Sequence, residues 1–267
     1  EQMQRIAREL NNSETAFMFE TDSPDYDIEV RFFTPTTEVP ICGHATIAAH
    51  YVRAKERNME GGTVIQKTKA GILPVEVVRT LSDYSITMTQ GTPAVSAPFG
   101  DTVRERIADA LGIAHEEICR EYPVAVASTG HSKVMVPLYS NELLHGLRPD
   151  LQKLTKISKQ IECNGYYVFT LNPQNKILVH GRMFAPAIGI AEDPVTGNAN
   201  GPLGAYLVHF NILQEEDAPC LDFDILQGEA VKRDGTIHVH VEKEHGAPKL
   251  VQITGNAVIA FSTEITI

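Results

Sequence analysis

The sequence predicts an α+β fold of two similar halves, each a mixed sheet curled around a central helix. An aromatic, strand-prone segment that ends in Pro occurs twice, as residues 31–35 (RFFTP) and 182–186 (RMFAP). Each copy leads into a Gly turn and then into a run of small residues. Alternating or apolar runs typical of strands occupy much of the remaining chain.

The two copies continue in the same way after the Pro. The Gly-x-Ala turns are residues 43–46 (GHAT) and 197–200 (GNAN), and the small-residue runs contain Tyr51 and Tyr206. A Pro cannot donate to a continuing ladder, so each strand should end there. A helix of Ala and Gly can lie very close to surrounding strands, which predicts a central helix in each half.

The other elements follow from periodicity and from stop signals. A helix is expected over residues 3–10, ending at Asn11, and a second over 103–111. Residues 91–100 contain two Pro and small residues and are interpreted as a linker, so the halves are placed at 1–98 and 99–267. Strands are expected at residues 15–19, 28–32, 73–78, 84–89, 124–126, 132–136, 166–171, 237–241 and 251–260.

Composition limits the class of protein. The chain has 267 residues, a net charge of −11 and a pI near 5.4, which argues against binding a nucleic-acid backbone. No apolar stretch is long enough to span a bilayer, and the N-terminus lacks a signal-peptide pattern. The four Cys are far apart and form no CxxC pair, so free thiols in the cytoplasm are expected and a metal site is not.

Glu14 is the first candidate catalytic residue, because it lies at the start of an apolar strand. One interpretation is an ordinary exposed Glu at a helix-to-strand corner, since Glu is usually solvated. The other is a partly buried general acid/base whose pKa is raised by burial toward the working pH.

The turn at residues 42–46 (CGHAT) is more specific. Its Gly opens a helix, so backbone N–H groups there can bind a carboxylate or an oxyanion. The positive helix end should disfavour the charged form of His44, and a neutral imidazole could donate or relay a proton near pH 7. A His that only caps or packs is the alternative.

Asp193 precedes a Pro just ahead of the second Gly turn, and it is the third candidate. A carboxylate at this position is often only a helix cap. If the repeat is real, however, the two turns should face the same cleft and bind one anionic substrate.

Other chemistries are disfavoured by what the chain lacks. The position that matches Cys42 in the second copy is Thr196, so a two-thiol racemase mechanism does not fit. Ser128 has no Gly-x-Ser-x-Gly elbow around it, and no phosphate-binding Gly loop is present. His238 and His240 share a strand face without an evident third ligand and are interpreted as surface residues.

The motifs together resemble the PhzF-like family, named for a phenazine-biosynthesis isomerase. The resemblance rests on residues 13–16 (SETA), 42–46 (CGHAT) and 192–199 (EDPVTGNA), with a weaker match at Gln227-Gly228. The sequence of residues 197–202 (GNANGP) is similar to that of the YddE-like branch. The resemblance implies a diaminopimelate-epimerase-like fold with a barrel-like sheet around each central helix.

The resemblance also implies the activity and the site. Glu14 would move a proton between two carbons of a small, carboxylate-bearing substrate, with His44 and Asp193 sharing in proton handling. The resemblance implies a homodimer, and it implies no metal or organic cofactor. The substrate-binding positions would be Gly43, Ala45, Gly197, Asn198 and Ala199.

Two departures from the family pattern affect these expectations. Asn198 stands where the phenazine enzyme has a Ser, so the substrate is expected to differ. The family's first strand is missing before the first helix, so an unpaired sheet edge is expected. The main alternatives to an isomerase are an amino-acid racemase or epimerase and a non-catalytic protein that binds a small anion.

Overall fold

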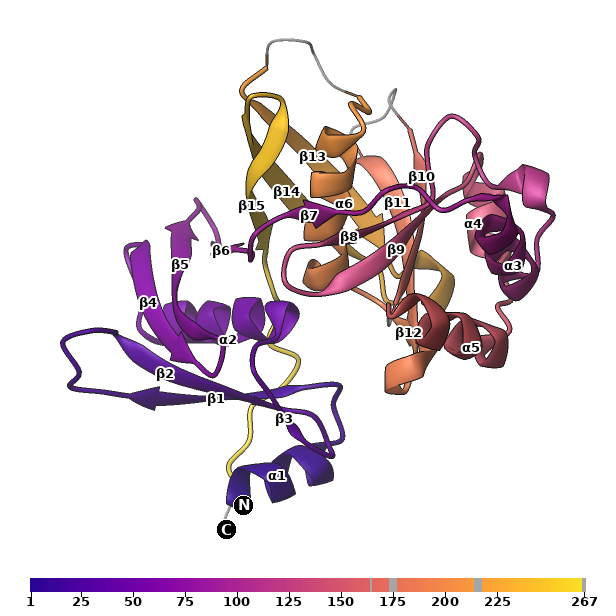
Figure 1. The fold of residues 1–267 in the computed structure, drawn as a ribbon. Coiled ribbons are helices and arrows are strands. Elements are labelled where there is room, and N and C mark those ends of the chain that lie inside the picture. Colours follow the sequence, from indigo (N-terminus) through magenta and orange to yellow (C-terminus); the bar gives the residue numbers. More distant parts are fainter. Residues whose placement is uncertain (164, 173–176, 214–217, 266–267) are drawn as a thin grey trace. The chain divides into compact units, whose positions relative to one another are not determined.

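The computed structural model describes residues 1–163, 165–172, 177–213 and 218–265, and the chain folds as two compact units (Figure 1). The first unit combines Glu1–Thr89 with Thr254–Ile267, and the second is Gln90–Ile253. These units differ from the expected halves, because the boundary lies before residue 98 and the C-terminal segment belongs to the first unit.

Hydrogen bonds explain where the second unit begins. The backbone N–H of Gln90 donates to the carbonyl oxygen of Val251 (2.8 Å), and that of Gly91 donates to Thr129 (3.0 Å). The expected linker then forms strand β7 (Ala94–Val95), which pairs with β8 (Ala125–Ser128). The segment therefore belongs to the sheet of the second unit.

The first unit is a mixed sheet with one long helix against it. Its strands follow the order β1-β2-β4-β5-β6, with β3 beside β2. All these pairs are antiparallel except β2–β4, which is parallel. Helix α2 packs against β1, β5 and β6. The elements are α1 (Gln2–Leu10), β1 (Thr15–Glu20), β2 (Ile28–Phe33), β3 (Glu38–Val39), α2 (Gly43–Glu56), β4 (Gly62–Thr68), β5 (Gly71–Arg79) and β6 (Tyr84–Thr89).

Local sequence accounts for these elements. Helix α1 ends at Asn11, whose left-handed φ of 50° suits an Asn. In β2, Ile28, Val30 and Phe32 are fully buried, while the residues between them are partly exposed. This alternation is what a half-buried strand requires.

The second unit contains a larger mixed sheet. Its strand order is β15-β14-β13-β11-β10-β9-β8-β7, with β12 beside β11, and the β9–β10 and β11–β13 pairs are parallel. The remaining elements are α3 (Asp101–Leu111), η1 (His115–Glu117), β9 (Ser132–Pro137), α4 (Asn141–Gly146), α5 (Leu151–Ile161), β10 (Tyr166–Leu171), β11 (Ile177–Ala185), η2 (Pro186–Ile188), β12 (Ile190–Asp193), α6 (Gly197–His209), β13 (Cys220–Gln227), η3 (Glu229–Val231), β14 (Gly235–Glu244) and β15 (Ala247–Gly255).

Helices cover both faces of this sheet (Figure 1). On one face, the hydroxyl of Tyr166 donates to the carbonyl of Leu154 in α5 (2.9 Å). On the other face, the ring of Phe169 meets Tyr206 of α6 with centroids 5.8 Å apart. Burial on both faces explains why β10 reads as a continuous apolar run rather than an alternating one.

Helix α6 shows why its small residues are needed. A Cβ added at Gly204 would lie 2.7 and 2.8 Å from side-chain atoms of Val241 and Val239. The helix can approach β14 this closely only because the position lacks a side chain. The predicted central helix of small residues is confirmed in the second unit.

The internal repeat is visible in the packing of the two units. In the first, Arg31 of β2 makes a bidentate ion pair with Glu38, with N–O distances of 2.7 and 2.9 Å. In the second, Arg182 of β11 pairs in the same way with Glu192, at 2.9 and 2.7 Å. Each Arg also lies over the ring of the Phe two residues later. The repeat thus includes a strand, a bidentate pair and the helix that follows.

Most of the predicted elements are confirmed, and some predictions are wrong. The last strand ends at Gly255 rather than at residue 260, and residues 256–265 have no regular secondary structure. Residues 257–265 are largely exposed and lack the buried alternation that holds β15 in its sheet. Periodicity did not predict β4, α4, α5 and β13.

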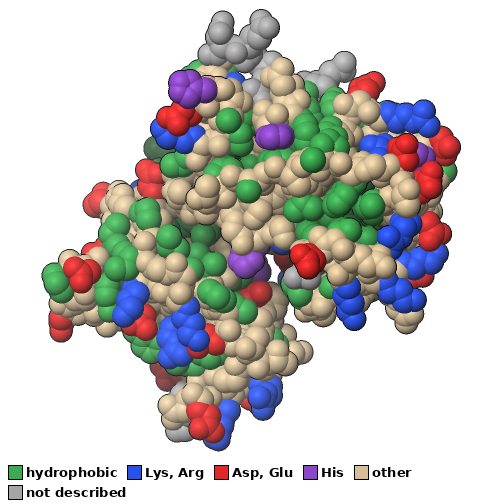
Figure 2. All heavy atoms as spheres, in the orientation of Figure 1, with side chains coloured by type: hydrophobic (Ala, Val, Ile, Leu, Met, Phe, Trp, Pro, Cys, Tyr) green, Lys and Arg blue, Asp and Glu red, His purple; other side chains and the backbone are tan. Residues whose placement is uncertain are grey.

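The helices and the charged side chains on the surface agree with the expectations from the composition about membrane spans and charge. No helix in the described ranges is long and apolar enough to cross a membrane. On the face drawn in Figure 2, Lys and Arg side chains lie among Asp and Glu side chains rather than in one continuous basic area. This face therefore offers no continuous basic area of the kind that a nucleic-acid backbone requires.

Candidate functional site

Glu14 lies between the end of α1 and the start of β1. Its side chain is only 15% exposed. Thr15, the next residue, pairs with Phe33, so the β1–β2 ladder begins immediately after the carboxylate and holds it in place. The structure therefore supports the partly buried interpretation of Glu14 over an exposed corner.

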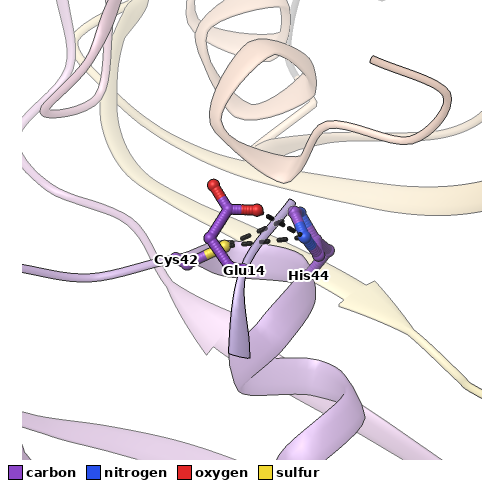
Figure 3. Close-up of side chains that lie close together, drawn as sticks. All are labelled: Glu14, Cys42 and His44. Carbon is purple, nitrogen blue, oxygen red and sulfur yellow. Dashed lines mark hydrogen bonds and ion pairs between the residues drawn. The ribbon is translucent and has the colours of Figure 1, made fainter. Parts of the chain in front are cut away.

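His44 is the second residue of α2, and it gathers three side chains around its ring. Its Nε2 lies 3.1 Å from Glu14 Oε2 and 3.3 Å from Ser13 Oγ. The Cys42 Sγ lies 3.6 Å from Nδ1. Figure 3 shows the Glu14 carboxylate and the Cys42 thiol both directed at the imidazole, at the first turn of α2.

These contacts reverse both predicted pKa shifts. Burial alone would raise the pKa of Glu14, but the adjacent His44 and Ser13 lower it below its ordinary value. Burial alone would lower the pKa of His44, but Cys42 and Glu14 raise it well above its ordinary value. The predictions were wrong because the charge-assisted contacts outweigh burial at both residues and, at His44, also the helix end, which contributes about 0.3–1 kcal/mol. The pair is therefore a carboxylate beside an imidazolium at neutral pH.

This pairing predicts a pH-dependent contribution of His44 to stability. Because its folded pKa is raised, the contribution is complete below the ordinary value of 6.5 and is lost as the pH rises through the folded pKa. We expect the difference in melting temperature between the wild type and His44→Asn to shrink steadily above pH 6.5. The exposed His245→Asn variant is the control, and a difference that grows with pH would contradict the pairing.

The two oxygens of Glu14 differ in their surroundings. Oε2 is fully buried and is the oxygen that faces His44 Nε2 at 3.1 Å. The carboxylate borders a pocket of about 380 Å³ within the first unit. The pocket is lined largely by apolar or small residues, among them Ala16, Met18, Ala48 and Val52.

The start of α2 adds unused donors beside the carboxylate. The cap residue Cys42 makes no side-chain hydrogen bond to the helix, and the first intrahelical bond is from the N–H of Thr46 to the Cys42 carbonyl (2.9 Å). The N–H groups of Gly43, His44 and Ala45 are therefore the free donors of the first turn. Such a turn binds anions.

The second Gly turn, in the other unit, is held by a buried side chain. Gln227 donates through Nε2 to the carbonyl oxygen of Asp193 (2.7 Å). Its Oε1 accepts from the Thr196 N–H (3.2 Å) and from Asn200 Nδ2 (3.0 Å). The Asp193 carboxylate accepts from the Thr196 hydroxyl at 2.6 Å. Asp193 thus closes the turn before α6 through the hydroxyl of Thr196, which is the N-cap residue.

A buried cation belongs to the same region of the second unit. Lys133 of β9 is 8% exposed, and its stem covers Gly165, where a Cβ would lie 2.5 Å from Lys133 Cδ. Burial lowers the pKa of Lys133, and the nearby Cys163 and Asp193 oppose that shift. Lys133 therefore lies near enough to Asp193 for the two side chains to interact electrostatically.

The structure brings together Glu14, His44, Gly43 and Ala45 in the first unit. It brings together the other four predicted residues, Asp193, Gly197, Asn198 and Ala199, in the second. Sequence reasoning missed the contacts of Ser13 and Cys42 with His44, and it missed Lys133. Gln227 could have been found, because the Gln227-Gly228 pair was already a weak motif match.

Comparisons with known proteins agree with this architecture. The family model described as phenazine biosynthesis-like protein (PhzC-PhzF) matches residues 1–263. The uncharacterized isomerase YddE of Escherichia coli K12 is 50% identical over 263 residues, covering 98% of this chain and 87% of its own. The trans-2,3-dihydro-3-hydroxyanthranilate isomerase of Pseudomonas chlororaphis is 29% identical over 259 residues, covering 96% and 85%.

Solved structures show the same fold. The crystal structure of a Bacillus anthracis phenazine biosynthesis protein of the PhzF family has a TM-score of 0.88 at 30% identity, covering all of this chain and 89% of its own. A hydroxyproline epimerase from Agrobacterium vitis has a TM-score of 0.59 at 12% identity, covering 91% and 71%. The second likeness concerns the fold alone.

The fold and these relatives define an isomerase with an epimerase-like fold. Within that class the chain belongs to the PhzF family of phenazine biosynthesis-like proteins, and it is similar to the isomerases named YddE. The resemblance inferred from the three sequence motifs is confirmed.

Proposed function

We propose that this isomerase moves a proton between two carbons of a small, carboxylate-bearing substrate, with Glu14 as the acid/base. One observation carries the proposal. The Glu14 carboxylate is 15% exposed, borders a largely apolar pocket and lies 3.1 Å from His44. A carboxylate with this environment is charged at neutral pH, so it can take a proton.

The proposed cycle uses only groups of this chain. Glu14 takes a proton from one substrate carbon, and the electron pair of the broken C–H bond moves into the adjacent unsaturated system. The N–H groups of Gly43, His44 and Ala45 bind the carboxylate or the oxygen that gains charge. Glu14, now protonated, returns the proton to a second carbon. The reaction is redox-neutral, and the base is regenerated.

Asp193, Gly197, Asn198 and Ala199 are proposed to bind substrate through the second turn. Helix α6 has no side-chain cap from Thr196, so the N–H groups of Gly197 and Asn198 are donors without a cap partner. That both turns act on one substrate stays a prediction, as does a homodimer.

A cyclic, unsaturated carboxylate is the proposed substrate class, because the Pseudomonas chlororaphis relative is named for trans-2,3-dihydro-3-hydroxyanthranilate. The test is incubation of the full chain with that compound and related cyclic carboxylates in deuterium oxide. Deuterium appearing at carbon, followed by mass spectrometry and NMR, is the expected result. Ligand-induced thermal stabilisation with no exchange for any compound would instead indicate a binding protein.

An amino-acid racemase is the second candidate, and one contact favours it. Cys42 Sγ lies beside His44, where a thiol could be activated. The position matching Cys42 in the repeat is the buried Thr196, which is not a thiol. The fold is shared with a hydroxyproline epimerase, but likeness at this identity speaks only to fold.

Replacement of Cys42 by Ala should separate these two candidates. We expect the variant to keep deuterium exchange within about threefold of the wild type, because general acid/base catalysis by Glu14 does not need the thiol. Cys163→Ala, also buried, is the control for lost packing. Abolished exchange in Cys42→Ala alone would favour the thiol mechanism.

A further inference from the structure

Two imidazoles and a carboxylate converge in the second unit, in a cluster separate from Asp193 and Gly197. The cluster consists of His145 in α4, His180 in β11 and Glu229 in η3. Glu229 Oε2 lies 2.7 Å from His180 Nδ1 and 3.2 Å from His145 Nε2. The three ligand-type atoms all lie within 4.8 Å of one another.

The framework around the cluster fixes the two His residues. Gly181 faces the core, since a Cβ there would lie 2.0 Å from the Tyr167 hydroxyl, so His180 and Arg182 project from the opposite face of β11. Arg182 donates to the carbonyl oxygens of Leu144 (3.0 Å) and Leu147 (3.1 Å). These bonds hold the last turn of α4, which carries His145, against β11.

Two further contacts complete the framework. Thr170, the cross-strand neighbour of His180, donates to the side chain of Asn141 at the start of α4. Gly228, just before Glu229, has φ 92°, and a Cβ there would meet the carbonyl oxygen of Arg233 at 2.3 Å. The turn that presents Glu229 therefore requires Gly at position 228, and the bonds from Arg182 and Thr170 hold α4 beside β11.

The composition of the cluster suits a metal ion. In the described part of the chain, no Lys or Arg forms an ion pair with Glu229, whose two ion-pair partners are the imidazoles. Bonds of about 2.0–2.2 Å from a divalent ion to N and O ligands place neighbouring ligand atoms about 2.9–3.4 Å apart. The 3.2 Å separation already fits, and the 2.7 Å separation needs only a small movement of the carboxylate.

We propose that His145, His180 and Glu229 bind a divalent transition-metal ion such as Zn²⁺ or Co²⁺. Two imidazoles and one carboxylate are a ligand set that such ions favour. The side chains keep exposed fractions of 37%, 14% and 27%, so water can fill the remaining coordination positions. The site is distinct from the proposed acid/base residues, and it does not depend on the proposed function.

A second cluster provides an internal control. Cys220, Asp222 and His240 on β13 and β14 also place ligand-type atoms within 4.8 Å. Asp222 is 46% exposed and is shared by His238 and His240, so this cluster is more open to solvent than the first. A metal held there, or at Glu14, Cys42 and His44, would include a thiolate.

The test is equilibrium dialysis of the chelator-treated full chain against Co²⁺ and, separately, Zn²⁺. We expect His180→Ala and Glu229→Gln each to bind one equivalent of metal fewer than the wild type. The affinity of the proposed site for the ion should fall about 100-fold or more in each variant. His240→Ala should keep that equivalent. The Co²⁺ bound at the proposed site should give a ligand-field spectrum without a thiolate charge-transfer band.

The outcome that overturns the proposal is equal metal content in the wild type and these variants, or loss of the equivalent only in His240→Ala. His145→Ala is the ligand variant with the least risk of misfolding, because this residue is partly exposed at the end of a short helix. Circular dichroism and the melting temperature in chelator establish that each variant is folded before its metal content is counted.

Discussion

Replacement of Glu14 by Gln is expected to reduce deuterium exchange into substrate by about 10²–10⁴-fold, the range that general acid/base groups contribute. The amide keeps the shape of the carboxylate but cannot take a proton. The effect should appear mainly in kcat, because the N–H groups at the start of α2 still bind the substrate carboxylate. The measurement is initial-rate exchange in deuterium oxide, followed by mass spectrometry.

The matched control for this variant is Glu20→Gln. Glu20 lies at the other end of β1, where it is 58% exposed and pairs with Arg57. It should exchange at the wild-type rate, so a loss confined to Glu14→Gln points to chemistry rather than to strand stability. Exchange at the wild-type rate in Glu14→Gln would remove Glu14 as the base, whatever the substrate.

Local sequence was sufficient to predict the fold and the two turns. A Pro that follows an aromatic strand cannot donate to a continuing ladder, so residues 31–35 and 182–186 predicted strand ends in both copies. Ala and Gly in the runs that follow predicted closely packed helices, as Gly204 shows. These signals are carried by neighbouring residues and need no knowledge of tertiary contacts.

The electrostatics of the site could not be predicted in the same way. Glu14 and His44 are far apart in sequence, and their mutual contact decides the direction of both pKa shifts. The helix-end argument for His44 was sound in isolation, but the carboxylate and the thiol beside the ring outweighed it. Likewise, Glu229 is 49 residues from His180 and 84 from His145, so no spacing pattern indicated that cluster.

The Arg–Glu pairs of the repeat give the largest expected effect on stability. Arg182→Met leaves Glu192, 14% exposed, without its bidentate partner and removes two donors from the end of α4. Loss of one member of a buried pair costs about 3–5 kcal/mol. Chemical denaturation of the wild type and the variant, followed by circular dichroism, measures this cost.

Arg31→Met is the matched control within the same chain. Arg31 is 34% exposed, and without it Glu38 still pairs with Lys69 at 2.6 Å, so we expect a cost of about 1 kcal/mol. Arg182→Met/Glu192→Gln should regain part of the loss, because it removes the orphaned charge. If Arg31→Met and Arg182→Met lowered the free energy of unfolding equally, the burial of the Arg–Glu pair would not determine how much it stabilises each copy of the repeat. Since Arg182 also holds the turn that carries His145, its loss should weaken metal binding as well, whereas Arg31→Met should not.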